Sequence, residues 1–204
     1  MLNKADASNK NKIVSYRILS AECVENVFKA VKVIREGGVI AYPTEYCFGL
    51  GCDPRDLSAV KRIIEIKQRN PNQGLILLAA NIEQVTEYAC LDSLSLKTQI
   101  LETWPGPVTW TLPARQGTSE WLRGKHSSIA LRITAHQISA SICAEFDHAI
   151  VSTSANVHAK PALLNATDVI AEMGKYIDYV MPESVGGTEK PSQIRDGLSG
   201  EILR

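Results

Sequence analysis

Hydroxyl-bearing and cationic side chains gather at the ends of several expected strands and helices. The groups are Thr44-Glu45, Lys67-Gln68-Arg69, Ser128 with Arg132, Ser152-Thr153-Ser154-Ala155-Asn156, and Ser192 with Arg195 and Arg204. Cations and hydroxyls are donors that proteins direct at phosphates and carboxylates. The sequence therefore indicates a site for a polyanion together with a small polar molecule, and it does not indicate a hydrolytic triad.

Two of these groups also admit purely structural interpretations. The serine-rich group follows an expected apolar strand at residues 149–151, so it is either a turn with a helix cap or a nest of donors for an anion. Lys67 and Arg69 are either a solvated helix end or, because Asn70-Pro71 ends the helix, two cations that converge on one ligand. The residues alone leave both choices open.

Motifs for other nucleotide, hydrolytic and metal chemistry are missing. The chain has no Gly-x-x-x-x-Gly-Lys-Ser/Thr loop, no Gly-x-Gly-x-x-Gly fingerprint and no Gly-x-Ser-x-Gly turn, and its 4 histidines show no zinc spacing. The 5 cysteines form no Cys-x-x-Cys pair, so we expect buried free thiols in a reducing compartment and no metal ligands. Cys47 lies close to Thr44 and Glu45 and is a candidate nucleophile, although the chemistry inferred below does not need one.

Length and composition indicate one globular domain. The 204 residues are 45% hydrophobic, and 22 Lys and Arg balance 22 Asp and Glu. A net charge of zero gives no global attraction to nucleic acid, so such binding needs a local patch. No apolar run approaches the roughly 20 residues of a membrane span, and the polar start carries no secretory signal. We expect a disordered tail at residues 1–12, a single catalytic domain at residues 13–204, and a cytoplasmic location.

Hydrophobic periodicity predicts alternating strands and helices. Strands are expected at residues 13–19, 39–42, 75–80, 108–113, 128–134, 149–151, 179–181, 192–196 and 201–204. Helices are expected after a Ser20 cap, after Asp53 or Asp56, and at residues 81–89, 93–103, 136–146 and 167–176, with a loop at 117–127. The first helix should bury Val24, Val27, Phe28, Val31 and Ile34. Some neighbouring strands lack a helix between them, which favours a three-layer α/β/α fold around a twisted mixed sheet.

Six motifs follow one another from about residue 18 to the end of the chain. They are Ala41-Tyr42-Pro43-Thr44-Glu45 with Phe48-Gly49-Leu50-Gly51, Lys67-Gln68-Arg69, Trp104-Pro105-Gly106-Pro107-Val108-Thr109, Ser128-Ile129-Ala130-Leu131-Arg132, Ser152-Thr153-Ser154-Ala155-Asn156, and Ile202-Leu203-Arg204. Together they resemble the threonylcarbamoyl-adenylate (threonylcarbamoyl-AMP) synthase family, the YrdC-type domain, in its short single-domain bacterial form.

This resemblance implies a YrdC-like fold with a basic groove, and it implies an activity. L-threonine, bicarbonate and ATP would condense to threonylcarbamoyl-adenylate with release of pyrophosphate, assisted by Mg²⁺. A separate transferase complex would then move the threonylcarbamoyl group to a tRNA adenosine beside the anticodon.

The resemblance also implies roles for individual residues. Lys67 and Arg69 would be catalytic cations that hold the triphosphate and the carbamate. The remaining nucleotide contacts would come from Ser128, Ser154, Asn156 and Arg204, and the threonine contacts from Thr44, Arg132, Ser152 and Ser192. Departures from the longer family form fall at Tyr46, Gln73 and Leu78. Glu45 is a candidate for handling the amine proton, with a threonine contact or an internal cap as alternatives.

Two other functions fit parts of the sequence. A related domain of hydrogenase-maturation proteins makes a carbamoyl-adenylate from carbamoyl phosphate, but it belongs to a longer chain with cysteine pairs that this sequence lacks. An RNA-binding module for ribosome or tRNA maturation would use the basic loop with Arg115, Arg123, Lys125 and His126. The neutral net charge and 6% aromatic content argue against strong stacking on bases, so the expectation is weak RNA binding through a basic groove.

Overall fold

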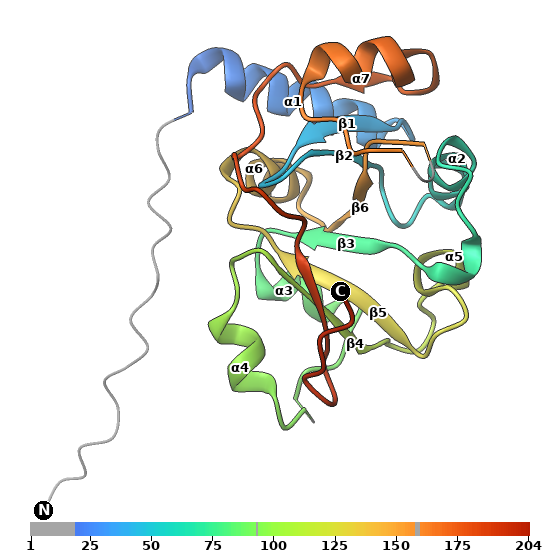
Figure 1. Cartoon of the computed structure of the whole chain (residues 1–204), viewed down its shortest axis with the longest axis vertical. Coiled ribbons are helices and arrows are strands. Elements are labelled where there is room, and N and C mark those ends of the chain that lie inside the picture. Colours follow the sequence, from blue (N-terminus) through green and yellow to red (C-terminus); the bar gives the residue numbers. More distant parts are fainter. Residues whose placement is uncertain (1–18, 93, 158–159) are drawn as a thin grey trace, which may run out of the picture.

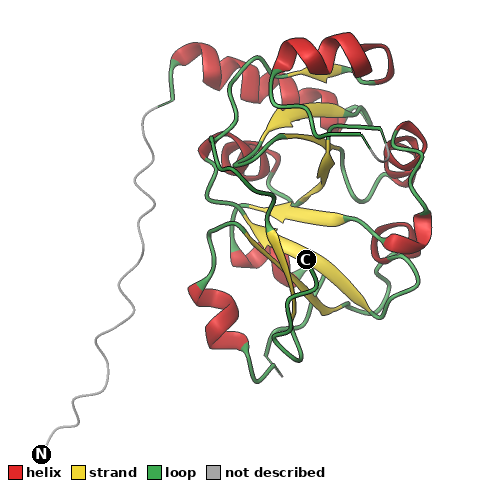
Figure 2. Ribbon diagram, viewed as in Figure 1, coloured by secondary structure: helices red, strands yellow, loops and turns green. Residues whose placement is uncertain are grey.

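A mixed eight-stranded sheet forms the centre of the molecule (Figures 1 and 2). The computed structural model describes residues 19–92, 94–157 and 160–204. The strands are β1 (Ile40–Pro43), β2 (Phe48–Gly51), β3 (Ile76–Ala79), β4 (Val108–Pro113), β5 (Ser128–Ile133), β6 (Ile150–Ser154), β7 (Tyr179–Val180) and β8 (Gln193–Asp196). Their order in the sheet is β7-β1-β2-β6-β3-β5-β4-β8. Because β3 pairs parallel with β5 and antiparallel with β6, the predicted mixed sheet is confirmed.

Helices cover both faces of the sheet, which confirms the three-layer prediction. They are α1 (Ala21–Arg35), α2 (Leu57–Ile66), α3 (Ile82–Thr86), α4 (Lys97–Glu102), α5 (Glu120–Arg123), α6 (Gln137–Phe146) and α7 (Ala166–Met173), with 3₁₀ turns η1 (Pro71–Gln73) and η2 (Gly174–Tyr176). Strand alternation separates two cores, since Leu77 lies in one and its neighbour Leu78 in the other. Helices α1 and α6 bury their apolar sides in the Leu78 core, and the remaining α-helices contribute to the Leu77 core.

Capping residues fix the starts of the long helices as the sequence predicts. The Ser20 hydroxyl accepts a hydrogen bond from Cys23 N, and the Asp56 carboxylate accepts from Ser58 N at the start of α2. The predicted buried face of α1 is partly wrong, because Val24 and Phe28 are 39% and 53% exposed. Helix α1 contacts the core along one stripe only, so the two residues beside that stripe face outward.

Several predicted boundaries are also wrong. The helix expected at residues 81–89 ends at Thr86, the one expected at 93–103 covers only Lys97–Glu102, and residues 201–204 form an isolated bridge instead of a strand. The loop expected at 117–127 contains α5, and the serine-rich group belongs largely to β6 instead of a turn. The expected tail at residues 1–12 and nearly all of the strand expected at 13–19 lie outside the described residues.

The face that carries α1 and α6 is only partly covered by helices. On β5, Ile129 and Leu131 point into the opposite core, so Arg132 points toward this partly covered face. The same alternation on β4 buries Trp110 and Leu112 on the far side and turns Thr109 and Thr111 to this one, and Ser152 on β6 does likewise. Small and polar side chains thus replace apolar ones where no helix packs, and the uncovered part of the sheet becomes the floor of a cavity.

Candidate functional site

A cavity of about 660 Å³ lies over the uncovered part of the sheet. Its walls come from the turn between β1 and β2, from β3, β4, β5, β6 and β8, and from the end of the chain. The predicted site residues in its lining are Thr44, Arg69, Ser128, Arg132, Ser152, Ser154, Ser192 and Arg204. Lys67 and Asn156 are not part of the lining. The structure therefore brings together predicted residues from five of the six motifs, and Ser192 in addition to them.

Two arginines place positive charge in the wall of the cavity. Arg69 follows α2 and donates through Nε to Gly74 O at 3.1 Å, and Arg204 donates through Nη2 to Ser192 O at 3.4 Å. Among the described residues, neither arginine forms an ion pair with a carboxylate. Burial, and then the charge of Arg204, lowers the pKa of Arg69. Two cations that repel each other and lack an acid partner favour the binding of a polyanion such as a phosphate chain.

Lys67 holds the end of β6 instead of facing the cavity. Its ammonium donates to Ser154 O at 2.5 Å, to Asn156 O at 2.9 Å and to Asn156 Oδ1 at 2.7 Å. The Ser154 hydroxyl donates to the same Asn156 Oδ1 at 2.8 Å. Burial, and then the charge of Arg69, lowers the pKa of Lys67 to about 8. The lysine and the asparagine therefore fix the position of Ser154, which does line the cavity.

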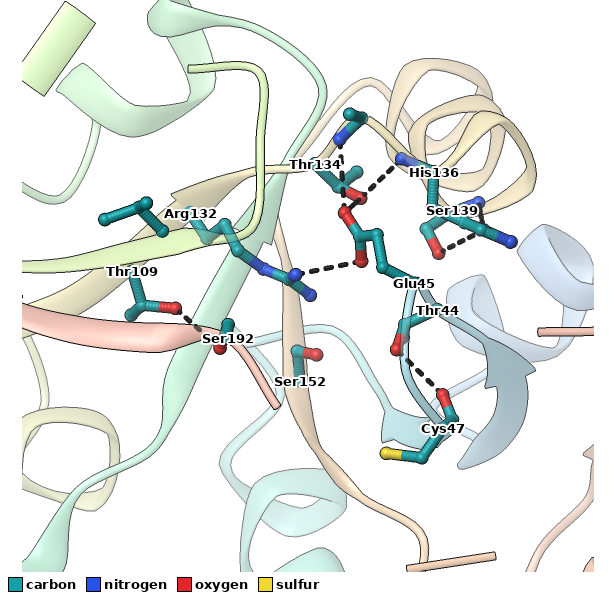
Figure 3. Close-up of polar contacts among 12 residues, drawn as sticks. Thr44, Glu45, Cys47, Thr109, Arg132, Thr134, His136, Ser139, Ser152 and Ser192 are labelled. Carbon is teal, nitrogen blue, oxygen red and sulfur yellow. Dashed lines mark hydrogen bonds and ion pairs between the residues drawn. The ribbon is translucent and has the colours of Figure 1, made fainter. Parts of the chain in front are cut away.

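A buried ion pair between Arg132 and Glu45 also belongs to the lining of the cavity (Figure 3). Arg132 Nη1 donates to Glu45 Oε2 at 2.8 Å, and both side chains are about nine-tenths buried, with 8% and 11% exposed. Glu45 Oε1 accepts from the Thr134 hydroxyl at 2.8 Å and from Ala135 N at 3.2 Å. Burial by itself would raise the pKa of Glu45, but the Arg132 charge and these hydrogen bonds outweigh it and lower the pKa. Glu45 is thus an ionised acceptor held by surrounding donors.

The β1–β2 turn carries Thr44 and Cys47 beside this pair (Figure 3). The Thr44 hydroxyl donates to Cys47 O at 2.7 Å, which closes the turn and leaves the hydroxyl oxygen as an acceptor. Burial raises the pKa of the Cys47 thiol to about 11, so the thiol is protonated near neutral pH. A neutral thiol is a poor nucleophile, and Cys47 is therefore not needed in the chemistry of this site.

Hydroxyl groups complete the floor of the cavity. Ser152 accepts a hydrogen bond from the buried Tyr42 hydroxyl at 2.8 Å. Ser192 lies 3.2 Å from the Thr109 hydroxyl, with either oxygen able to donate. Sequence reasoning missed Thr109 and Thr111. The alternation of residues 108–113 was the available signal, because the two threonines occupy its polar side next to Arg132.

The segment of residues 181–192, called the strap here, closes the cavity on one side. It connects β7 and β8, which are the two opposite edges of the sheet, and it descends in Figure 1 as the orange-red trace that leads to β8. Gly186 N donates to Thr44 O at 2.9 Å and Thr188 N donates to Glu45 O at 2.9 Å. Those two bonds attach the strap to the turn that carries Thr44.

We expect a Gly186→Ala variant to loosen the strap. A Cβ atom at this position would lie 3.0 Å from Glu45 Cα and 3.2 Å from Glu45 O, so the strap must move away. Weakening the hydrogen bonds between the strap and the β1–β2 turn should speed amide hydrogen exchange at Thr188 by about tenfold. That factor corresponds to the free energy of about one typical hydrogen bond. Gly174→Ala is the matched control, because its Cβ would meet no described atom closer than 3.6 Å. Equal exchange rates in both variants would show that the strap is held by other contacts.

The described residues contain neither a metal cluster nor a membrane span. No three His, Cys, Asp or Glu side chains converge as metal ligands anywhere in the described parts of the chain. No helix within residues 19–92, 94–157 or 160–204 is long and apolar enough to cross a membrane.

In the basic loop that precedes β5, the Arg123 side chain forms hydrogen bonds within the loop itself. Arg123 donates to Thr118 O, to His126 O and to Glu120, and it is therefore a support for the loop. Of the loop's basic residues, His126 lines the cavity.

Fold, cavity and comparison with known proteins together define the class of this protein. Residues 32–204 match the model of the Sua5/YciO/YrdC family, whose description is "Telomere recombination". The chain belongs to this family, and the resemblance found in the sequence is confirmed. E. coli YciO, at 21% identity and a TM-score of 0.75 over 88% of this chain and 90% of its own, shares the fold.

More similar relatives carry one functional name. A threonylcarbamoyl-AMP synthase of Nitrosococcus oceani is 45% identical over 86% of this chain and 95% of its own length. A threonylcarbamoyl-AMP synthase of Coxiella burnetii is 39% identical over 88% and 97%. The structure of P. abyssi Sua5 complexed with L-threonine matches with a TM-score of 0.80 and 30% identity over 87% of this chain. This chain spans about half of that Sua5 chain, 53% of its length.

Proposed function

We propose that this protein is a threonylcarbamoyl-AMP synthase, a nucleotidyl-transferring enzyme that uses L-threonine, bicarbonate and ATP and releases pyrophosphate. The observation that carries the proposal is the convergence of two kinds of anion site in one cavity. Arg69 and Arg204 offer a site for a phosphate chain, and Arg132 with Ser152 offers a separate site for a small carboxylate. The names of the curated relatives and the threonine bound to a related Sua5 support the same assignment.

The reaction needs two bond-forming steps, and the cavity provides charge for both. The threonine amine attacks the carbon of bicarbonate, a C–OH bond of bicarbonate breaks as the N–C bond forms, and the hydroxide leaves as water with the proton lost by the amine, which gives a carbamate. A carbamate oxygen then attacks the α-phosphorus of ATP, and the bond from that phosphorus to the bridging oxygen of pyrophosphate breaks. Negative charge develops on the leaving pyrophosphate, where Arg69 and Arg204 would stabilise it. Arg132 would neutralise the threonine carboxylate, while Thr44, Ser152 and Ser192 would orient the substrate.

The remaining predicted residues act on the nucleotide in different ways. Ser128 and Ser154 line the cavity and would contact ATP directly. Lys67 and Asn156 would act through the position of Ser154, to which both are hydrogen-bonded. Their contribution to catalysis is therefore the placement of a nucleotide contact, in addition to the positive charge that Lys67 brings near Arg69.

A Mg²⁺ ion that arrives with ATP would need few ligands from the protein. Glu45 and Asp196 are the carboxylates in the lining, and Thr134 or Thr111 already donates to each of them. Mg²⁺ is commonly held by substrate phosphates and water with few protein ligands. Phosphate oxygens would hold the ion here, and its charge would neutralise the triphosphate.

The product is a mixed anhydride that a further enzyme must consume. We assign this role to a separate complex that transfers the threonylcarbamoyl group to a tRNA adenosine next to the anticodon, in the cytoplasm. Weak RNA binding through the basic groove is a secondary proposal, supported by Lys190, His126 and Arg204 at the cavity. Such binding would weaken steeply with added salt.

A pyrophosphate-release assay tests the proposed function. Release should require ATP, L-threonine and bicarbonate together, and omission of any one should reduce it to background. Mass spectrometry should identify threonylcarbamoyl-adenylate as the product. Release without threonine, or release that depends on carbamoyl phosphate, would contradict the proposal and favour the carbamoyl-adenylate reaction. Sequence-specific, salt-insensitive RNA binding without any release would favour the RNA-binding module.

A further inference from the structure

The hydrogen bonds around Glu45 assign a role to this residue that differs from proton transfer. We propose that Glu45 is a positioning residue, which orients the Arg132 guanidinium so that its remaining donors face the carboxylate of the amino-acid substrate. The inference rests on the proposed function, because it names the acceptor of Arg132 as threonine.

The Glu45 carboxylate is already occupied by protein donors. One oxygen accepts from Arg132 Nη1, and the other accepts from the Thr134 hydroxyl and from Ala135 N. Thr134 in turn accepts from His136 N at 3.1 Å, so the start of α6 supports the same network (Figure 3). A general base needs a free lone pair directed at the substrate amine. Protein donors occupy three of the roughly four acceptor positions of Glu45, both on Oε1 and one on Oε2, so the carboxylate acts chiefly as an anchor.

Arg132 has donor capacity that the protein does not use. The side chain is 8% exposed and lines the cavity, and among the described residues its guanidinium donates one hydrogen bond, from Nη1 to Glu45, while Nη2 has no partner and Nε is buried without one. Buried donors without partners are rare in folded proteins and point to a missing ligand or water. A guanidinium offers five donors in a fixed plane, so holding Nη1 at Glu45 fixes the direction of all the others. Glu45 therefore determines where a carboxylate can bind.

The main chain of the same residue attaches the strap. Glu45 O accepts from Thr188 N, four residues before Ser192, which is itself part of the cavity lining. The Glu45 side chain thus contacts the floor of the cavity, and its main-chain carbonyl holds the strap. Only the side-chain role is changed by substitution, and it can therefore be tested separately.

Direct binding of L-threonine is the measurement that tests this role. Titration calorimetry is carried out with the whole chain, in the presence of ATP and without added bicarbonate. Glu45→Gln should raise the Kd for threonine by at least about tenfold, since the neutral amide cannot hold the guanidinium as a charged partner does. The Kd for ATP, measured alone, should change by less than about twofold because Arg69 and Arg204 are untouched.

A milder variant keeps the test valid if Glu45→Gln does not fold. Thr134→Val removes one donor from the Glu45 carboxylate and the acceptor of His136 N, and it leaves the ion pair, so the threonine Kd should rise by about two- to fivefold. Thr86→Val is the matched control, because its hydroxyl donates to Glu83 O at 2.8 Å on α3, outside the cavity. That control should bind threonine as the wild type does.

The possible outcomes separate this inference from the proposed function. In an Arg132→Gln background, adding Glu45→Gln should not weaken threonine binding further, because the two residues act as one unit. Additive losses, or an unchanged threonine Kd with a reduced turnover number, would overturn the positioning role and return Glu45 to proton transfer. A wild-type chain that binds no threonine and releases no pyrophosphate would instead refute the proposed function itself.

Discussion

Replacing Arg69 by alanine should lower the rate of pyrophosphate release at least about 100-fold while leaving the fold intact. A preorganised donor that meets charge developing in the transition state contributes on the order of 3 kcal/mol, and Arg69 is placed for this by the end of α2. Among the described residues, the Arg69 side chain donates one hydrogen bond, to Gly74 O. Removing this side chain should therefore lower the stability of the fold only slightly. Steady-state pyrophosphate release and the melting temperature of the same preparations measure both effects.

Arg62→Ala is the matched control for this experiment. Arg62 lies on α2 and pairs with Asp178 at 2.6 Å, away from the cavity lining. Turnover of Arg62→Ala should stay within about twofold of the wild type, because Arg62 does not line the cavity. Its fold should also be kept, because exposed ion pairs contribute less than about 1 kcal/mol to stability. Arg69→Lys should recover part of the lost rate, since it restores the charge but not the planar fork of donors. A wild-type rate in Arg69→Ala would return Arg69 to the solvated helix end that the sequence also allowed.

Local signals carried most of the fold prediction. Caps at Ser20 and Asp56 depend on residues within three positions, and each appears in the structure as a side chain that accepts from the first turn of a helix. Alternation between apolar and polar residues predicted β4 to the residue. Such patterns express the backbone geometry of single elements, so they can be recognised without knowing what packs against the element.

Features that depend on distant partners were not predictable in the same way. The sequence left the group that contains Ser152 and Ser154 as either a turn with a helix cap or a nest of donors, because three hydroxyls are costly to bury without hydrogen bonds. In the structure β6 is paired on both sides, with Ile76 opposite Ser152 and Gly49 opposite Ser154. The burial penalty is offset by hydrogen bonds, from Tyr42 to Ser152 and from Ser154 to Asn156. No local pattern reports which face of a sheet remains uncovered. The prediction that Phe28 is buried was wrong for a related reason, because the elements packed against a helix decide how wide its buried face is.

The site shows the same division between local and distant information. Its motifs could be found from the sequence, but the roles of their members depend on contacts across the chain. Lys67 reaches Asn156 over a separation of 89 residues, and Arg132 reaches Glu45 over 87. The family resemblance assigned Lys67 to the triphosphate and the carbamate, and Glu45 was left between three roles. The structure supplies the partners, and these indicate that the two residues support Ser154 and Arg132.

Replacing Lys67 by methionine should therefore reduce stability and turnover together. The substitution removes the donor shared by three oxygens: Asn156 O loses its described partner, while Ser154 O keeps Asn156 N and Asn156 Oδ1 keeps the Ser154 hydroxyl. An unsatisfied acceptor that is shielded from water costs about 1–3 kcal/mol. For a chain of this size each 1 kcal/mol lowers the melting temperature by about 2–4 °C, so a loss of several degrees is expected. Turnover should fall at least about tenfold because Ser154 is no longer fixed. Thermal melting and pyrophosphate release measure the two effects.

Lys61→Met, on the exposed side of α2, is the control and should change turnover by less than about twofold.

The pH dependence gives a second test of Lys67. Because burial and Arg69 lower its pKa to about 8, raising the pH through that value removes its charge and leaves two hydrogens for three acceptors. Wild-type turnover should therefore decline above about pH 8, and this decline should be absent from the residual activity of Lys67→Met. If turnover collapses while the melting temperature stays unchanged, Lys67 contacts the nucleotide directly and the supporting role is wrong.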